Sequence, residues 1–396
     1  MICFTTAGES HGKALTAVLE GVPAGLQLVA GDVDRELQRR MAGHGRGDRM
    51  QIENDAVAFL SGVRNGESLG SPISMLIRNR DWDNWSNVMS PEPDVDSKEP
   101  RRHAVTRPRP GHADLVGALK YDRKDARDIL ERASARETAA RVACGAVCRK
   151  LLSEFSVEIG SHVVQLGDVV AAAPSELPTP INQHADASPA RCLDEDASIA
   201  MVEAIDAAVE AKDTLGGMSE IVARGLVAGL GSHVSWDRRL DARWAGAVMS
   251  IQGVKGVEIG AGFDAARRKG SELHDEIVAG DRHVAGGYVR ASNRAGGLEG
   301  GMTTGEPLLL RAAMKPISTL KRPLRTVNLE TGLPDSAHAE RADITAVPAM
   351  GVIAEAMVAL VLAAAMTEKF GGDSLVEMRD NLDAYVKRMN TRLERG

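Results

Sequence analysis

Alternating apolar and polar positions predict β-strands along much of the chain. Residues 14–30 predict a strand pair, in which Leu15 and Leu19 alternate before a turn rich in glycine and proline, and Leu26 and Leu28 alternate after it. Further strands are expected at 52–60, 73–77, 217–230, 247–263 and 307–314.

Apolar residues three and four positions apart predict helices. In the helix expected over 32–41, Val33 and Leu37 face inward, and the arginines, including Arg39 and Arg40, face outward. Longer helices are expected at 125–152, 199–212 and 347–366, with another near the carboxyl terminus.

The apolar stretch 347–366 is long enough to span a bilayer. It contains Pro348 and, near its middle, Glu355, and a carboxylate at mid-span is costly in lipid. Helices that are apolar on all sides also occur deep inside large soluble folds. We therefore expect a buried helix in a soluble, cytoplasmic protein. No signal peptide is expected, because polar residues at 9–12 interrupt the first apolar stretch.

Two long segments lack a regular pattern and are expected to be surface excursions: 79–112, which is polar and rich in proline, and 171–198. A loop as long as 79–112 inside a compact protein is usually functional or disordered. Strands and helices alternate without clean βαβ units, which favours an α+β or layered α/β class. No boundary divides the chain, so we expect one large domain over 1–396.

The composition narrows the function. Of the 396 residues, 48 are basic and 55 acidic, and a net charge of −7 disfavours non-specific binding to nucleic acid. Aromatic residues, at 3%, are too few for base-stacking platforms. Most basic residues are arginine, which either reflects genome composition or serves bidentate recognition of phosphate and carboxylate. Four cysteines form no disulfide framework, and Cys144 and Cys148 are interpreted as small buried thiols rather than metal ligands.

Six polar constellations carry candidate chemistry. The first is 8–12, where glycines flank Ser10 and His11; the alternative is a turn with an exposed histidine. The second surrounds the glycine-rich loop 43–47, whose backbone N–H groups are free to face an anion, although a solvated helix face is the ordinary explanation. Its arginines are Arg39, Arg40, Arg46 and Arg49.

The third constellation, 107–114, holds Arg109 and His112 on a proline-stiffened segment suited to anion binding and proton transfer, or serves as an extended surface linker. In the fourth, Ser134 and Glu137 have the spacing of a capping box. A helix beginning there would offer free N–H groups to an anion, flanked by Arg132 and Arg136.

The fifth constellation is 315–319, where Lys315 and two hydroxyl residues follow an apolar strand as a candidate phosphate cradle. The sixth contains Arg341 and Asp343, and Asp343 is either a held base or an ordinary salt-bridge partner. No dinucleotide fingerprint, Walker lysine or nucleophile elbow is present. Together the constellations favour a site for a small polyanion with proton transfer, and phosphate elimination or transfer fits best.

In order and spacing, these constellations resemble the chorismate synthase family over nearly the whole chain. The stretches that carry the resemblance are GESHG, RPRPGHAD, RASARETAARVACGA, MSIQGVKGVEIG, NRAGGLEGGMTTGEP, MKPIST and RADITAVPAMGVIAE. The resemblance implies a lyase that converts 5-enolpyruvylshikimate 3-phosphate into chorismate and phosphate in the shikimate pathway of aromatic amino acid biosynthesis. This anti 1,4-elimination requires reduced FMN without net redox change. A layered β-α-β sandwich and a homotetramer are also implied.

The resemblance further implies residue roles. His11 would protonate the leaving phosphate, and His112 would interact with reduced flavin as a proton donor. Ser10 and Asp343 would tune flavin N5, which takes the substrate proton. The implied substrate contacts are Arg40, Arg46, Arg49, Arg109 and Arg136, and NADP is linked to Arg40 and Arg46. The implied FMN contacts are Arg132, Ala133, Ser134, Gln252, Gly253, Gly300, Lys315, Pro316, Ile317, Ser318, Thr319 and Arg341.

This chain departs from the usual family pattern at Ala133, Gly253 and Ala342. All three residues are small, so backbone contacts to flavin are expected to survive. No added reductase domain is evident, so we expect flavin to be reduced by an external source, with NADPH as a candidate reductant. The competing hypotheses are a flavin oxidoreductase that consumes NADPH stoichiometrically and a polyanion-binding module without flavin.

Overall fold

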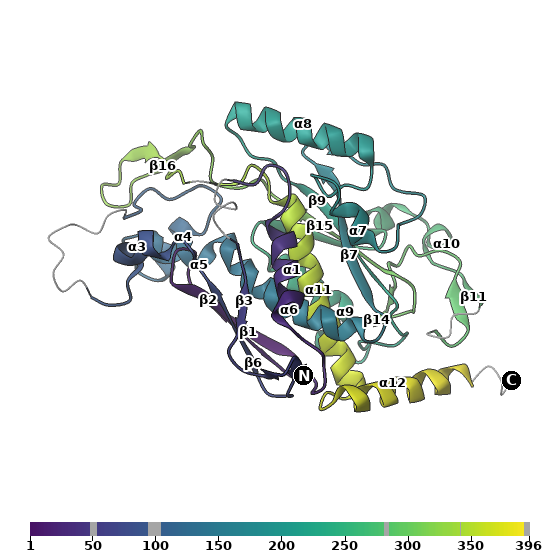
Figure 1. The fold of residues 1–396 in the computed structure, drawn as a ribbon. Coiled ribbons are helices and arrows are strands. Elements are labelled where there is room, and N and C mark those ends of the chain that lie inside the picture. The colour runs from purple at the N-terminus through teal and green to yellow at the C-terminus, as the bar shows by residue number, and fades with distance from the viewer. Residues whose placement is uncertain (48–53, 94–103, 281–284, 341, 392–396) are drawn as a thin grey trace.

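The protein is described by a computed structural model over residues 1–47, 54–93, 104–280, 285–340 and 342–391 (Figure 1). Two antiparallel sheets dominate these residues. The first has the strand order β1 (Cys3–Ala7), β2 (Ala14–Glu20), β6 (Ile73–Arg78) and β3 (Val57–Phe59). The second has the order β10 (Val254–Ile259), β15 (Leu308–Met314), β9 (Gly217–Arg224), β7 (Glu158–Leu166) and β8 (Val169–Val170).

Three helices lie between the sheets: α1 (Ala30–Met41), α6 (Thr138–Ser153) and α11 (Val347–Phe370) (Figure 1). Helix α6 packs against β2 of the first sheet and against α11, and α11 packs against β7 and β9 of the second sheet. Gly145 lets α6 and α11 approach closely, because a methyl group there would lie 2.3 Å from Cβ of Ala356. The observed class is mixed helix and sheet, as predicted.

The remaining elements connect or flank these layers. Their helices are α3 (Trp82–Met89), α4 (Asp114–Lys120), α5 (Arg127–Ala133), α7 (Ile181–Ala185), α8 (Glu195–Ala211), α9 (Leu240–Met249), α10 (Gly270–Leu273) and α12 (Leu375–Asn390), with 3₁₀ turns at Ala135–Glu137, Trp236–Arg238 and Gly262–Arg267. The short strand pairs are β4 (Val63–Arg64) with β5 (Glu67–Ser68), β11 (Ile277–Ala279) with β12 (Tyr288–Arg290), β13 (Leu298–Glu299) with β14 (Met302–Thr303), and β16 (Arg325–Val327) with β17 (Pro334–Ser336).

Helix α11 is the predicted apolar helix. Within the described residues it alone is long and apolar enough to cross a membrane, and 94% of its most apolar window is buried inside the protein. Its contacts with α6, α9 and both β7 and β9 account for an apolar surface on every side. The prediction of a buried helix is confirmed.

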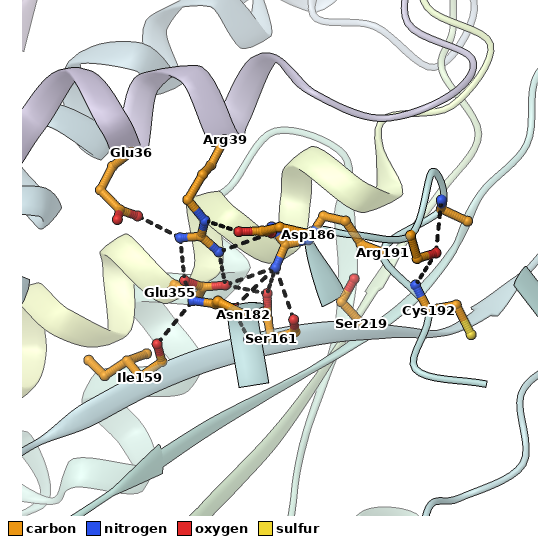
Figure 2. Close-up of polar contacts among 12 residues, drawn as sticks. Glu36, Arg39, Ile159, Ser161, Asn182, Asp186, Arg191, Cys192, Ser219 and Glu355 are labelled. Carbon is orange, nitrogen blue, oxygen red and sulfur yellow. Dashed lines mark hydrogen bonds and ion pairs between the residues drawn. The ribbon is translucent and has the colours of Figure 1, made fainter. Parts of the chain in front are cut away.

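Glu355 lies near the middle of α11 and gathers a buried ion network (Figure 2). Its carboxylate pairs with Arg39 of α1 (Nη1–Oε2, 2.9 Å), Arg191 (Nη2–Oε1, 3.2 Å) and Arg149 of α6, and accepts from Oγ of Ser161 (2.6 Å). Burial opposes ionisation of Glu355, but the three guanidinium groups outweigh it and hold its pKa well below the ordinary value.

The outward placement of Arg39 and Arg40 was therefore wrong. The side chains of Arg39 and Arg40 are 12% and 4% exposed, because α1 packs between other elements and its arginines find buried partners there. Val33 and Leu37 are buried, as predicted.

Other boundaries also differ from the prediction. The strand pair over 14–30 forms only its first strand; Leu26 and Leu28 are buried outside any ladder. The helix predicted over 125–152 is broken, because Ser134 has an extended conformation between α5 and the next turn. The stretch 247–263 begins with the end of α9 rather than a strand.

The two predicted surface excursions contain more structure than expected. The segment 79–112 includes α3, and its residues 94–103 lie outside the described part of the chain. The segment 171–198 includes α7, and Arg191 and Cys192 are buried. Polar partners such as the carboxylate of Glu355 explain how an arginine from a proline-rich segment reaches the interior.

Candidate active site

The turn that carries His11 lies against α5. The backbone N–H of Ser10 donates to the carbonyl of Glu131 (3.0 Å), and the N–H of His11 donates to the Glu131 carboxylate (2.8 Å). Nδ1 of His11 lies 3.0 Å and 2.9 Å from the two oxygens of that carboxylate. Glu131 therefore holds the imidazole at Nδ1, and Nε2 is left to exchange a proton with a bound molecule.

An indole ring and a guanidinium group complete the surroundings of His11. The ring of Trp85 lies over His11, with ring centres 3.9 Å apart, and the guanidinium carbon of Arg127 lies 5.1 Å from the centre of the Trp85 ring. Nη1 of Arg127 donates to Glu131 (2.9 Å). Burial opposes ionisation of Glu131, but hydrogen bonds and charge from His11, together with the Arg127 charge, lower its pKa.

The segment 107–114 places a second imidazole beside a second buried carboxylate. Nδ1 of His112 lies 2.5 Å from Oδ1 of Asp114, and Nε of Arg109 donates to Oδ2 of Asp114 (2.8 Å). Burial opposes ionisation of Asp114, but hydrogen bonds from His112 and Arg109 hold its pKa well below the ordinary value. Nη1 of Arg109 also donates to Thr319 (2.8 Å), which ties this segment to the loop after β15.

The predicted cradle at 315–319 closes on the His112 segment. Nζ of Lys315 donates to the carbonyl of Gly111 (2.6 Å) and to Oγ of Ser318 (2.6 Å), and Ser318 donates to the same carbonyl (2.9 Å). Burial and the nearby charge of Lys255 lower the pKa of Lys315. The structure thus brings the third and fifth constellations together.

Two of the predicted substrate arginines meet at Asp55. Nη1 of Arg136 lies 2.5 Å from Oδ2 of Asp55, and Nη1 of Arg40 lies 4.0 Å from the same oxygen. Arg136 also donates to Oδ1 of Asn79 (2.9 Å), whose amide nitrogen donates to two carbonyls in the turn around His11. Asn79 therefore connects the pair of arginines to the first imidazole.

The glycine-rich loop brings Arg46 to Asp343. Nη1 of Arg46 lies 3.1 Å from Oδ2 of Asp343, and the N–H of Gly47 donates to Oδ1 (2.7 Å). Asp343 therefore has a salt-bridge partner, and the same contacts hold its carboxylate in place. Arg49 and Arg341 lie outside the described residues.

The break after α5 joins two predicted flavin contacts. Oγ of Ser134 donates to Oγ of Ser10 (3.2 Å) and accepts from the backbone N–H of Arg136 (3.3 Å). Ser134 caps the 3₁₀ turn as predicted, but the reciprocal half of the capping box is wrong, because the Glu137 carboxylate accepts from Oγ1 of Thr6 (2.6 Å). Helix α6 begins only after this turn, at 138.

Arg132, Gln252 and Gly253 join the same region. Arg132 donates to Oγ1 of Thr6 (2.8 Å), and Nε2 of Gln252 donates to the Glu137 carboxylate (3.0 Å). Oε1 of Gln252 is buried and accepts no hydrogen bond from the described residues. The carbonyl of Gly253, which has φ +87°, accepts from the backbone of the loop after β15 (2.9 Å).

The remaining predicted flavin contacts are located by the elements that carry them. Ala133 ends α5 beside Ser134, and the carbonyl of Ile317 accepts from Oγ1 of Thr214 (2.8 Å), with Pro316 preceding it in the cradle. Gly300 lies in the β13–β14 turn, near His233. Strand β14, which follows Gly300, packs against α9.

A cavity of about 230 Å³ adjoins α5 behind the His11 turn. Four carboxylates face one guanidinium group in its wall, so it would repel a polyanionic molecule. Its lining residues are Glu9, Val88, Met89, Ala104, Asp125, Arg127, Asp128 and Glu131. We therefore place anion binding at the arginines and not in this cavity.

Several residues of the site escaped the sequence analysis. They are Asp55, Asn79, Trp85, Asp114, Glu131 and Glu340. The signal available for Glu131 was its spacing of four from Arg127 on a helix, and Asp114 lies inside the third constellation. Asp55 and Asn79 gave no local signal, because the fold alone brings them to the arginines.

Chemically, the described residues offer two imidazoles with Nδ1 held by carboxylates and a set of guanidinium groups. Such a set can bind phosphate and carboxylate bidentately and deliver protons from Nε2. Within the described residues, no group of three or more His, Cys, Asp or Glu side chains is arranged to hold a metal ion.

Comparison with known proteins identifies the family. A sequence profile described as chorismate synthase matches residues 2–367. Chorismate synthases of Salinispora tropica and Thermobifida fusca are 55% and 54% identical over 392 residues, which cover 98% of this chain and 98% of each relative. A crystal structure of chorismate synthase superimposes with a TM-score of 0.78 at 42% identity, covering 98% of both chains. The chain therefore belongs to the chorismate synthase family of lyases.

Proposed function

We propose that the protein converts 5-enolpyruvylshikimate 3-phosphate into chorismate and phosphate by anti 1,4-elimination, in the shikimate pathway. The observation that carries this proposal is the pair of carboxylate-held imidazoles among buried arginines: His11 on Glu131 and His112 on Asp114. Loss of phosphate needs an acid, and an imidazole with Nδ1 fixed presents Nε2 for that role.

His11 is the proposed acid for the departing phosphate, and His112 the proton donor beside reduced flavin. Ser10 and Asp343 are proposed to face the flavin ring, where the substrate loses its proton. Ser10 already contacts Ser134 (3.2 Å), and Asp343 is held by Arg46. The ion pair with Arg46 and the hydrogen bond from Gly47 hold the Asp343 carboxylate in place.

The substrate carries one phosphate and two carboxylates, so its binding requires several cations. We assign this role to five arginines. They are Arg40, Arg46, Arg49, Arg109 and Arg136. Of the four that are described, Arg40, Arg109 and Arg136 are buried, and each of the four has an acidic residue within 4.0 Å. These carboxylates hold the guanidinium groups in place before an anion arrives, which lowers the ordering cost of binding.

The site also fits FMN. The buried Oε1 of Gln252 is an acceptor that no described group satisfies, and such an atom is costly unless a donor reaches it. The proposed FMN contacts are Arg132, Ala133, Ser134, Gln252, Gly253, Gly300, Lys315, Pro316, Ile317, Ser318, Thr319 and Arg341. Reduced FMN, when bound, would supply electron density that no side chain offers, without net redox change.

The domain organisation, the oligomeric state and the location in the cell are proposed from membership of the family. We propose one catalytic domain with a layered β-α-β sandwich, a homotetramer and a cytoplasmic location. A tetramer would bring Gly300 of one copy near another copy's site if the copies share their flavin contacts. An external reductant is proposed to reduce FMN, with NADPH as the candidate and Arg40 and Arg46 as its contacts.

Phosphate release tests the function directly. The purified protein is incubated anaerobically with 5-enolpyruvylshikimate 3-phosphate, with and without photoreduced FMN. We expect equal amounts of phosphate and chorismate, formed only with reduced FMN. Consumption of NADPH in proportion to product would favour the oxidoreductase alternative. Tight substrate binding without phosphate release or flavin binding would favour a polyanion-binding module.

A further inference from the structure

The two imidazole–carboxylate pairs share a third carboxylate, that of Glu340. Nη2 of Arg127 lies 3.4 Å from Oε1 of Glu340, and Nη1 of Arg109 lies 4.0 Å from Oε2. Arg127 is also the partner of Glu131, and Arg109 is the partner of Asp114. The two oxygens of Glu340 thus face different arginines, Oε1 that of the His11 pair and Oε2 that of the His112 pair.

The charges along this path alternate in sign. Burial opposes ionisation of Glu340, but a hydrogen bond from His338 (3.0 Å) and the charges of Arg109 and Arg127 lower its pKa to about 2. Glu340 is therefore ionised at neutral pH. In spatial order the path runs through His11, Glu131, Arg127, Glu340, Arg109, Asp114 and His112, with His338 beside Glu340.

We infer that Glu340 is a positioning residue that joins the two proton-transfer histidines into one electrostatic unit, an inference that rests on the proposed function. The Glu340 carboxylate restricts the rotation of the Arg127 and Arg109 side chains. Arg127 in turn holds Glu131, which orients His11, and Arg109 holds Asp114, which orients His112. Loss of the Glu340 charge would therefore change the surroundings of both rings through the same two guanidinium groups. Both histidines should therefore respond together when Glu340 changes.

The test is the variant Glu340→Gln, which removes the charge and keeps the shape. The matched control is Glu330→Gln, which removes an exposed carboxylate from the same connecting segment. Acylation of each imidazole by diethyl pyrocarbonate is followed from pH 5 to 8 by mass spectrometry of the peptides, with the exposed His184 as internal reference. This readout needs neither flavin nor turnover.

In Glu340→Gln we expect the midpoints for His11 and His112 to fall together by about 0.5 to 1 pH unit, since the lost charge acts across a partly screened distance. Glu330→Gln should leave both midpoints unchanged. A second variant, Glu340→Asp, keeps the charge and should keep both midpoints close to the wild-type values. A shift at only one histidine, or at neither, would overturn the inference.

Phosphate release by the wild-type protein is measured in parallel. Its absence would overturn the proposed function and leave the acylation result to decide the coupling. If phosphate release is present, Glu340→Gln should move the pH optimum of kcat in the same direction as the acylation midpoints. An optimum that stays in place while both midpoints fall would contradict a role in catalysis.

Discussion

Nη1 of Arg39 lies 2.9 Å from Oε2 of Glu355, so that a guanidinium group on α1 neutralises the carboxylate in the middle of the apolar helix α11. The next residue on α1 is Arg40, which donates to Oγ1 of Thr138 (2.9 Å) and to the turn before α6. The ion pair therefore fixes the helical turn from which Arg40 reaches the site. A stabilising contact in the core and a proposed substrate contact share one turn of helix.

Replacement of Glu355 by alanine should destabilise the protein strongly. The change leaves the buried Arg191 and the half-buried Arg39 and Arg149 without their common partner, and breaking a buried ion pair costs about 3–5 kcal/mol. Denaturation by urea, followed by circular dichroism, measures this loss. The control is Glu368→Ala in the same helix, whose partners Arg238 and Arg243 lie nearer the surface, where a pair contributes about 1 kcal/mol or less. Equal losses in the two variants would contradict the role of burial.

The dependence of stability on pH should also report on Glu355. Its pKa is depressed in the folded protein, so its contribution is present above the unfolded pKa of about 4.3 and is lost as pH falls toward the folded value. Wild type should therefore lose more stability than Glu355→Gln between pH 6 and pH 3.5. Urea midpoints at both pH values give the comparison. A constant difference between the two proteins would show that the carboxylate titrates normally.

His11→Ala should slow phosphate release by about 10²–10⁴-fold, the usual contribution of a general acid. Flavin should still bind, because the described contacts of Arg132, Gln252 and the 315–319 cradle do not depend on the imidazole. Anaerobic stopped-flow measurement of phosphate and a flavin titration separate the two effects. Unchanged turnover would dismiss the assignment of His11.

Arg49→Ala should weaken binding of the substrate far more than binding of flavin. The reason is charge: the substrate carries three acidic groups, whereas the ring of reduced flavin depends on other contacts. Calorimetric titrations with each ligand measure the two affinities. Arg35→Ala is a matched control, because Arg35 is an exposed arginine whose closest partner is Asp32 on its own helix. Equal losses for both ligands would contradict a substrate role for Arg49.

The hydrophobic pattern of the sequence predicted those helices and strands whose buried surfaces are marked by their own apolar residues. The apolar run that became α11, the alternation that became β2 and the apolar stretch that became β15 were recognisable because one surface, or every surface, of these elements is buried. Leu26 and Leu28 alternate in the same way, yet their segment forms only an isolated bridge, between Gln27 and Glu67 of β5, and not a strand paired with β2.

The site was predictable at the residues that carry distinctive motifs and less so elsewhere. Glycine and proline around His11 and His112 marked segments that approach a ligand. Glu131, which contacts the His11 ring, and Glu340, which contacts Arg127, reach these partners across more than 100 residues in the sequence, which no local spacing encodes. The outward placement predicted for Arg39 was wrong for the same reason, since a charged residue on a helix is ordinarily assigned to solvent.

The close packing of α6 against α11 should control how fast the cysteines of α6 react with alkylating reagents. Cys144 and Cys148 lie in that junction, and burial raises the pKa of the Cys144 thiol to about 12 and that of Cys148 well above its ordinary value. Since the thiolate is the form that reacts with alkylating reagents, neither sulfur should be alkylated while α6 and α11 stay packed together. The exposed Cys3 should react first, so the delay before Cys144 and Cys148 are alkylated, followed separately from Cys192, measures how often the contact between α6 and α11 opens.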